Sequence, residues 1–226
     1  MIKAEKLVRK FKTGDLELIA LKGVSFEIRP GEFLSIIGRS GSGKSTLLYQ
    51  LGLLDHPTSG KIYLDGTDTS ELNEDDRTNM RLKELGYIFQ DYALVPELTS
   101  VENVQAPLLM QGLSKIDSRK QAVKSLEKVG LGDRLKNLPN QLSGGEQQRV
   151  SIARAIGHNP KILFADEPTA NLDNETALSV LKVFKDLHEE GQTIIMVTHE
   201  KEYAAITNRT ITLFDGEIIS DERNRK

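Results

Sequence analysis

A glycine-rich segment near the start of the chain has the residue types and spacing of a phosphate-binding loop. It comprises Gly38, Arg39, Ser40, Gly41, Ser42, Gly43, Lys44, Ser45 and Thr46. Glycines let backbone N–H groups turn toward phosphate oxygens, a lysine neutralises the β- and γ-phosphates, and the serine after it binds Mg²⁺. The alternative is an ordinary turn before a helix. Because an apolar run precedes the segment and another begins at Leu47, the sequence favours a nucleoside triphosphate site.

Two carboxylates follow a second apolar run, Ile162–Ala165, and have the chemistry that phosphoryl transfer needs. Asp166, at the predicted strand tip, can join the Mg²⁺ shell, and Glu167 is placed to polarise an attacking water. Taken alone, the pair fits an acidic loop equally well. With Lys44 at the end of another apolar strand, the pair favours γ-phosphate chemistry, which depends mainly on charge and metal positioning.

The elements that would position these residues alternate between strands and helices. Apolar or alternating runs predict strands at 6–10, 24–28, 33–37, 62–64, 86–89, 162–165 and 193–197. The almost wholly apolar runs predict a central, largely parallel sheet, and the alternating ones predict a half-solvated antiparallel sheet. Helices are predicted at about 114–130, 145–156 and 174–190, with no strong strand signal in 97–138. Asp65-Gly66 and Asp215-Gly216 predict hairpin turns, and the polar tail 221–226 is expected to fray.

Length and composition exclude several classes of protein. The chain has 226 residues, of which 38% are hydrophobic and 28% charged, as in ordinary globular domains. Its formal charge of -3 lacks the positive excess that would attract nucleic acid. The absence of cysteine rules out disulfides and thiolate metal sites. No apolar run approaches the roughly 18 residues of a spanning helix, and the first residues do not resemble a signal peptide. We therefore expect an intracellular protein without a membrane-spanning segment.

The segment Leu142-Ser143-Gly144-Gly145-Glu146 resembles the signature motif of the ATP-binding-cassette (ABC) ATPases. Its serine and glycines open a predicted helix, whose N-terminus would form a second anion site. The alternative is an ordinary Ser-Gly-Gly helix cap. The resemblance implies a head-to-tail dimer, in which the signature of one subunit closes over ATP held by the phosphate loop of the other.

Other positions match the family in order. The resemblance implies that Gln90 reaches Mg²⁺ and the attacking water, that His199 contacts the γ-phosphate, and that Asp173 belongs to the D-loop. Phe11 matches an aromatic residue that stacks on adenine and is usually a tyrosine. Simpler alternatives remain open. Asp173 could be a helix cap without a role at the nucleotide, and Phe11 could belong to the core.

The resemblance assigns three sets of site residues. Catalysis is assigned to Glu167, His199, Gln90 and Lys44. Nucleotide binding is assigned to Phe11, residues 38–46, Gln90, Ser143, Gly144, Gly145, Asp173 and His199. Metal binding is assigned to Ser45, Gln90 and Asp166. Arg39 stands where the lipoprotein-release and macrolide-export group of cassettes commonly has proline. The side chain at this position faces away from the phosphates in such loops, so little loss of ATP binding is expected.

The resemblance extends from Phe11 to about Gly216 and implies an α/β P-loop NTPase fold. The expected architecture is one nucleotide-binding domain, 1–226, with a RecA-like core, an antiparallel β subdomain and a helical subdomain inserted at about 91–141. Segments 52–60, 98–104 and 167–173 look like those of the lipoprotein-release and macrolide-export group.

The implied function is that of an ATPase subunit that uses ATP and Mg²⁺, forms an ATP-dependent homodimer and drives a separate permease. It would lie at the cytoplasmic face of the membrane, without contacting nucleic acid. One alternative is a non-transporting regulatory cassette resembling the cell-division type. A soluble cassette acting on nucleic acid or ribosomes is less favoured, because long coiled coils, tandem cassettes and basic arms are missing. A small-molecule kinase would leave residues 142–148 without a role.

Overall fold

The computed structural model describes residues 2–14 and 16–224 and divides into two compact units. One unit consists of Met1–Asn79 with Gly191–Lys226, and the other of Met80–Glu190. The chain passes from the first unit to the second within helix α2 (Glu74–Glu84) and returns at Gly191. Each unit carries part of the predicted site.

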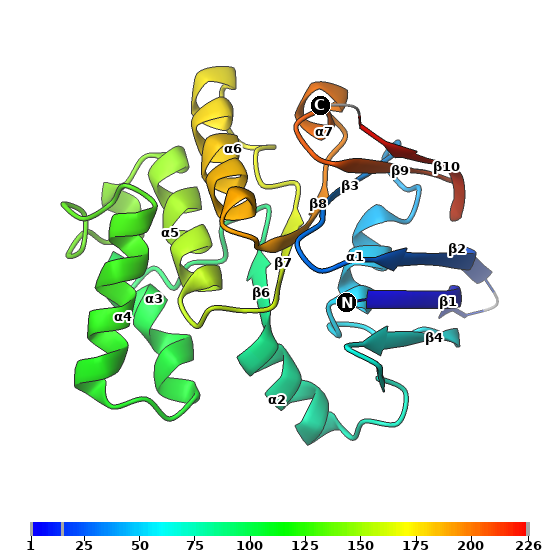
Figure 1. Ribbon diagram of the computed structural model, residues 1–226, viewed down its shortest axis with the longest axis horizontal. Coiled ribbons are helices and arrows are strands. Elements are labelled where there is room, and N and C mark those ends of the chain that lie inside the picture. The colour runs from blue at the N-terminus through cyan, green and yellow to red at the C-terminus, as the bar shows by residue number, and fades with distance from the viewer. Residues whose placement is uncertain (1, 15, 225–226) are drawn as a thin grey trace. The chain divides into compact units, whose positions relative to one another are not determined.

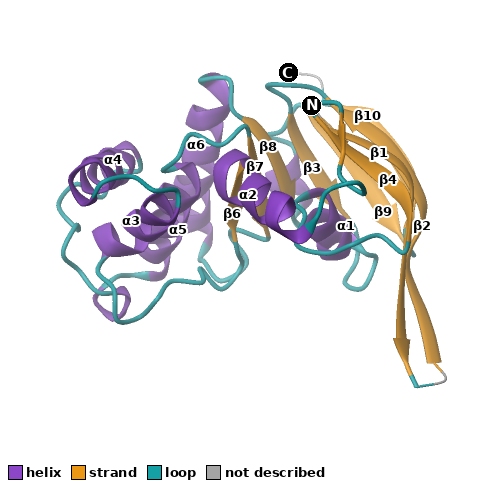
Figure 2. Cartoon of the chain, turned by 90° about the horizontal axis from the view of Figure 1, so that it is seen from below, coloured by secondary structure: helices purple, strands orange, loops and turns teal. Residues whose placement is uncertain are grey.

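The first unit contains an antiparallel sheet with strand order β2-β1-β4-β5 (Figure 1). Its strands are β1 (Ile2–Thr13), β2 (Leu16–Ile28), β4 (Ser59–Leu64) and β5 (Thr67–Asp68). The prediction of an antiparallel sheet is confirmed, although β1 and β2 are much longer than their apolar runs. Because β4 pairs with β1 only over Ile2–Val8, the outer part of the β1–β2 hairpin projects as a two-stranded ribbon (Figure 2).

The first unit also contains four mainly parallel strands, in the order β10-β9-β3-β8. They are β3 (Phe33–Ile37), β8 (Thr193–Val197), β9 (Arg209–Phe214) and β10 (Glu217–Arg223), accompanied by helices α1 (Lys44–Leu51) and α7 (Lys201–Ala204). β3 is parallel to both β8 and β9, and β10 is antiparallel to β9. Every residue of β8 is buried, as the apolar run predicts.

The predicted fraying of the tail 221–226 is wrong for its first residues. β10 continues to Arg223, and Arg209 Nε donates to Asp221 Oδ1 at 2.5 Å. The Asn224 side chain donates to Thr207 O at 3.0 Å, while 225–226 lie outside the described residues. The polar composition concealed the strand because strand pairing and an ion pair, rather than burial, hold it.

The second unit pairs β6 (Leu85–Ile88) with β7 (Ile162–Asp166) in parallel, and most of its helices lie to the left of the two strands in Figure 1. The helices are α3 (Ser100–Met110), α4 (Lys115–Lys128), α5 (Gly144–Ile156) and α6 (Asn174–Glu189), with a short 3-10 helix at Pro139–Gln141. Among the described residues, 97–138 holds no strand, as predicted. α5 packs against β6, α3, α4 and α6 and is therefore the central helix of this unit.

The contact between α5 and β6 requires a glycine. A Cβ at Gly86 would lie 2.5 Å from the backbone oxygen of Ala155 and 2.6 Å from Leu163 Cδ2. Backbone atoms cannot yield as a flexible side chain can, so the helix and strand would have to separate.

We predict that Gly86→Ala lowers the free energy of unfolding by about 1–3 kcal/mol through overpacking. The measurement is urea unfolding followed by circular dichroism. Gly132→Ala is the control, because its nearest contact would be the flexible Glu127 Cγ at 3.3 Å. Equal stability of the two variants would contradict this view of the α5–β6 contact.

Candidate functional site

The predicted phosphate loop joins the buried strand β3 to helix α1 and is pressed against neighbouring backbone. A Cβ at Gly38 would lie 2.4 Å from Leu213 O, and one at Gly43 would lie 2.4 Å from Ala20 O. Gly43 also has φ +98°, a conformation that L side chains rarely adopt. Glycine at these two positions therefore lets the loop lie against β9 and β2.

The loop offers polar groups suited to a polyphosphate. Among the described residues, no side chain caps α1, and the buried Ser42 hydroxyl has no hydrogen-bond partner. Lys44 is only 6% exposed, and its Nζ donates to Arg39 O at 3.0 Å. Uncapped N–H groups at a helix start attract anions, and an orphaned buried hydroxyl calls for a ligand. The residues of this loop therefore fit a triphosphate.

The other predicted residues of the loop are more accessible. Arg39, Ser40 and Gly41 are exposed, whereas Gly38, Gly43, Ser45 and Thr46 are partly buried. The exposure of Arg39 leaves its side chain free of the packed part of the loop.

His199 emerges at the same sheet edge as the phosphate loop. β3 and β8 are parallel with Ile36 opposite Val197, and Thr198 N donates to Ile36 O at 3.2 Å. The loop follows β3 and His199 follows β8 within two residues. The imidazole is half exposed, with Nε2 3.2 Å from Glu200 Oε1.

Phe11 lies in the projecting part of the β1–β2 hairpin, opposite Leu18. The exposed fractions are 39% for Phe11 and 66% for Leu18. The alternative that Phe11 belongs to the core is therefore wrong. An exposed ring of this kind can stack on a flat base.

In the second unit, Asp166, Glu167 and Gln90 meet at one strand edge. Ile88 of β6 lies opposite Ala165 of β7, so the residues that follow each strand emerge together. Asp166 is 6% exposed, whereas Gln90 is exposed. Glu167 has φ +44°, a strained conformation for a residue other than glycine, of the kind that occurs at functional sites.

The backbone around Gln90 is held by two side chains whose contacts the sequence did not predict. Asn171 Nδ2 donates to Gln90 O at 3.0 Å, and Arg154 Nη2 donates to Tyr92 O at 2.9 Å. Arg154 Nη1 also donates to Ala93 O. Tyr92 and Ala93 have φ of +63° and +48°, so Arg154 stabilises a strained turn. Nothing in the sequence distinguishes Arg154 from a surface arginine. In the folded chain, burial lowers the pKa of its guanidinium.

The signature segment starts α5 with a reciprocal cap. Ser143 Oγ accepts from Glu146 N at 3.3 Å, and Glu146 Oε2 accepts from Ser143 N at 2.9 Å. Arg134 Nε donates to the other carboxylate oxygen at 2.9 Å. The bond from Ser143 N is the largest cause lowering the pKa of Glu146. Ser143 is therefore a helix cap, and it remains exposed at the helix start.

Close packing joins the signature to the helix after the D-loop. A Cβ at Gly145 would lie 2.2 Å from Thr176 Cγ2, and one at Gly144 would lie 3.0 Å from the Tyr92 hydroxyl. Asp173 caps α6, with Oδ1 accepting from Thr176 N at 3.0 Å and Oδ2 from Thr176 Oγ1 at 2.7 Å. The bond from Thr176 N is the largest cause lowering the pKa of Asp173. The second unit thus brings the Gln90, signature and D-loop segments into contact.

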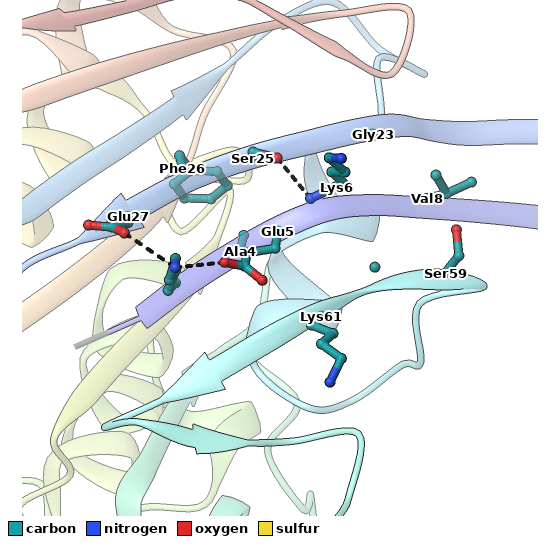
Figure 3. A pocket seen from close by; sticks show the side chains of 12 residues that line it. Ala4, Glu5, Lys6, Val8, Gly23, Ser25, Phe26, Glu27, Ser59 and Lys61 are labelled. Carbon is teal, nitrogen blue, oxygen red and sulfur yellow. Dashed lines mark hydrogen bonds and ion pairs between the residues drawn. The ribbon is translucent and has the colours of Figure 1, made fainter.

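A hollow on the antiparallel sheet is separate from these residues (Figure 3). It is lined by residues of β1, β2 and β4, none of which is a predicted site residue. Lys3 Nζ lies 2.6 Å from Glu5 Oε1 and 4.0 Å from Glu27 Oε1, so these three charges are paired within the sheet.

Among the described residues, no group of three or more histidine, aspartate or glutamate side chains could hold a metal. Within the same residues, no helix has the length and apolarity needed to cross a bilayer.

Comparison with known proteins agrees with this geometry. The family described as "ABC transporter" matches residues 21–170, more than half of the chain. The lipoprotein-releasing system ATP-binding protein LolD of Aquifex aeolicus is 49% identical over 201 residues, which cover 89% of this chain and 90% of that protein. The macrolide export ATP-binding/permease protein MacB of Chlorobium luteolum is 51% identical over 215 residues, which cover 95% of this chain. The match covers 32% of that MacB, so this chain spans about a third of its length.

A solved structure extends the agreement to the whole fold. The dimeric, post-hydrolysis state of the ATP-binding cassette MJ0796, bound to ADP and Pi, matches 100% of both chains with a TM-score of 0.92 and 42% identity. The expected α/β P-loop NTPase fold is confirmed. The chain therefore belongs to the ABC transporter family and is one of its ATP-binding and ATP-hydrolysing cassettes.

Proposed function

We propose that the phosphate loop holds ATP and that Glu167 directs its hydrolysis in a dimer of two copies. Lys44 and the N–H groups at the start of α1 neutralise the phosphates, and His199 contacts the γ-phosphate. The observation that carries the proposal is the loop itself, with its buried Ser42 hydroxyl, its buried Lys44 and an N-terminus that no described side chain caps. Phe11 stacks on adenine through its exposed ring.

Ser45, Asp166 and Gln90 are the proposed ligands for Mg²⁺, because hydroxyl, carboxylate and amide oxygens suit this ion. Bound Mg²⁺ supplies charge neutralisation at the β- and γ-phosphate oxygens. Glu167 orients and polarises the attacking water. Its strained backbone supports this role, since such strain persists where the surrounding structure enforces it.

The signature residues Ser143, Gly144 and Gly145, with Asp173, serve the nucleotide of the second copy. The exposed start of α5 supports this assignment, because a helix N-terminus attracts an anion. The dimeric form of the 42% identical cassette gives further support. Two identical sites follow naturally from a two-fold dimer of one chain.

The cassette drives a separate membrane permease from the cytoplasmic face of the membrane. The relatives named for lipoprotein release and macrolide export support transport rather than a purely regulatory role. The MacB relative is named as an ATP-binding/permease protein, and the match covers 32% of its length. We assign 1–226 to one nucleotide-binding domain, in which the helical insert at about 91–141, containing α3 and α4, receives the permease.

Replacing Glu167 should separate ATP binding from hydrolysis. Glu167→Gln removes the charge that polarises water, and phosphate release should fall by roughly 10²–10⁴-fold. ATP affinity, measured by calorimetry, should be nearly unchanged. Light scattering should show dimers accumulating with ATP and Mg²⁺.

Glu127→Gln on the exposed side of α4 is the control and should behave as the original chain does. Full hydrolysis by Glu167→Gln would contradict the catalytic assignment. Exclusively monomeric protein at saturating ATP and Mg²⁺ would contradict the dimer.

The signature glycine allows a size-compensation test. Gly145→Ala should hinder ATP-driven dimerisation, because the new methyl would lie 2.2 Å from Thr176 Cγ2 and displace the start of α5. Thr176→Ser removes that methyl and keeps a hydroxyl for the 2.7 Å bond to Asp173. The double variant should regain dimerisation and hydrolysis, measured by light scattering and phosphate release.

Thr176→Ser alone is the matched control and should dimerise normally. Normal dimerisation of Gly145→Ala, or failure of the double variant to recover, would exclude tight packing at this position as a requirement of the signature site.

A further inference from the structure

The adenine platform lies in a weakly supported part of the fold. β4 stops pairing with β1 at Val8, so Phe11 lies where only β1 and β2 pair. A two-stranded ribbon alone is marginally stable in water. A ring that must present a flat face to a base therefore needs support from elsewhere.

Arg9 provides a contact directly on the Phe11 ring. Its guanidinium carbon lies 4.5 Å from the ring centroid, which is cation–π distance. Its Nη2 donates to Asp55 Oδ1 at 2.8 Å, and about a quarter of each side chain is exposed. Arg9 is thus held by a carboxylate while it covers part of the ring. The 39% of Phe11 that stays exposed is left for the base.

Asp55 lies in the segment that leaves the phosphate-loop helix. α1 starts at Lys44 and ends at Leu51, and the chain then returns to β1. Thr58 N donates to Val8 O at 2.8 Å, and Lys10 N donates to Thr58 Oγ1 at 3.0 Å. The segment with Asp55 is therefore bonded to β1 on both sides of Arg9.

A buried arginine fixes the backbone of that segment. Arg77 is 2% exposed, and its Nη2 donates to Leu53 O at 3.3 Å and to Asp55 O at 3.2 Å. Leu53 is 1% exposed with φ +62°, a conformation that needs such support. Asp55 is therefore a rigid acceptor for Arg9.

The phosphate loop packs close to the same place. Gly43 lies against Ala20 and Leu21 of β2, and Leu21 is the residue opposite Arg9 in β1. Leu21 thus lies next to the loop and pairs with Arg9, and Arg9 in turn contacts Phe11. The groups that would hold the phosphates and the base are therefore linked through Leu21 and Arg9.

We propose that Arg9 and Asp55 are positioning residues for adenine, which orient Phe11 relative to the phosphate loop. The proposal rests on the proposed function in one respect, that Phe11 stacks on the base. Neither residue touches the reacting atoms, so both set affinity for the base and leave the hydrolytic step unchanged.

The test compares ATP with inorganic tripolyphosphate, which lacks a base, by calorimetry on the full chain with Mg²⁺. Arg9→Gln and Asp55→Asn should each weaken ATP binding by roughly three- to tenfold, the size of a partly buried cation–π contact, and leave tripolyphosphate affinity within about twofold. KM for ATP should rise with kcat unchanged. Arg9→Lys keeps a cation and should recover part of the affinity. Adding Arg9→Gln to Phe11→Ala should cause no further loss.

Lys10→Gln is the matched control, because it breaks the neighbouring 2.9 Å ion pair with Glu17 in the same hairpin. Its ATP affinity should be unchanged. Urea midpoints of all variants show whether the unit is folded. Where a midpoint falls, the ratio of ATP to tripolyphosphate affinity still separates base positioning from general damage.

Three results would overturn the proposal. First, Arg9→Gln could weaken the binding of tripolyphosphate as much as that of ATP. Second, its effect on ATP binding could add fully to that of Phe11→Ala. Third, Arg9→Gln and Asp55→Asn could both bind ATP normally while Phe11→Ala does not. The last would leave Phe11 as the adenine platform. Normal ATP affinity of Phe11→Ala would instead remove the adenine assignment of the proposed function, and the positioning role with it.

Discussion

The start of α1 must be buried among neighbouring strands and still leave its backbone donors available. This constraint explains the glycines, because a Cβ at Gly38 or Gly43 would meet backbone oxygens of β9 or β2 at 2.4 Å. It also explains why no described side chain caps α1, whereas Thr99, Ser143 and Asp173 cap α3, α5 and α6. An unfilled helix start is costly without a ligand, and a polyphosphate satisfies it.

The second unit holds its part of the site in place with a complete helix cap, close packing and side-chain hydrogen bonds. At the start of α5 the cap is complete, and Arg134 balances the charge of Glu146 beside it. Gly145 lets α5 lie against Thr176, so the signature and the D-loop are packed as one body. Arg154 and Asn171 hold the backbone around Gln90. Three segments distant in sequence therefore have a fixed geometry within this unit.

The sequence allowed prediction of features with local causes. Apolar runs and glycine spacing located β3, β7, β8 and the phosphate loop, and the helix cap considered for Asp173 is present. Features held by distant partners were not predicted. The end of β10 depends on Arg209, the turn after Gln90 on Arg154, and the support of Phe11 on Asp55 and Arg77. Each of these residues looks like an ordinary charged surface residue in the sequence, and only folding brings it to its hydrogen-bond partner.

The central claim is that one copy supplies the phosphate loop and the other supplies the signature. Mixing two inactive variants, Lys44→Ala and Ser143→Arg, and measuring ATP hydrolysis tests it most directly. A mixed dimer combines the intact loop of one variant with the intact signature of the other at one of its two sites. Random pairing should then restore about a quarter of the original activity, although each variant alone is inactive. A mixture as inactive as its components would contradict the claim, because each site would then be completed within a single chain.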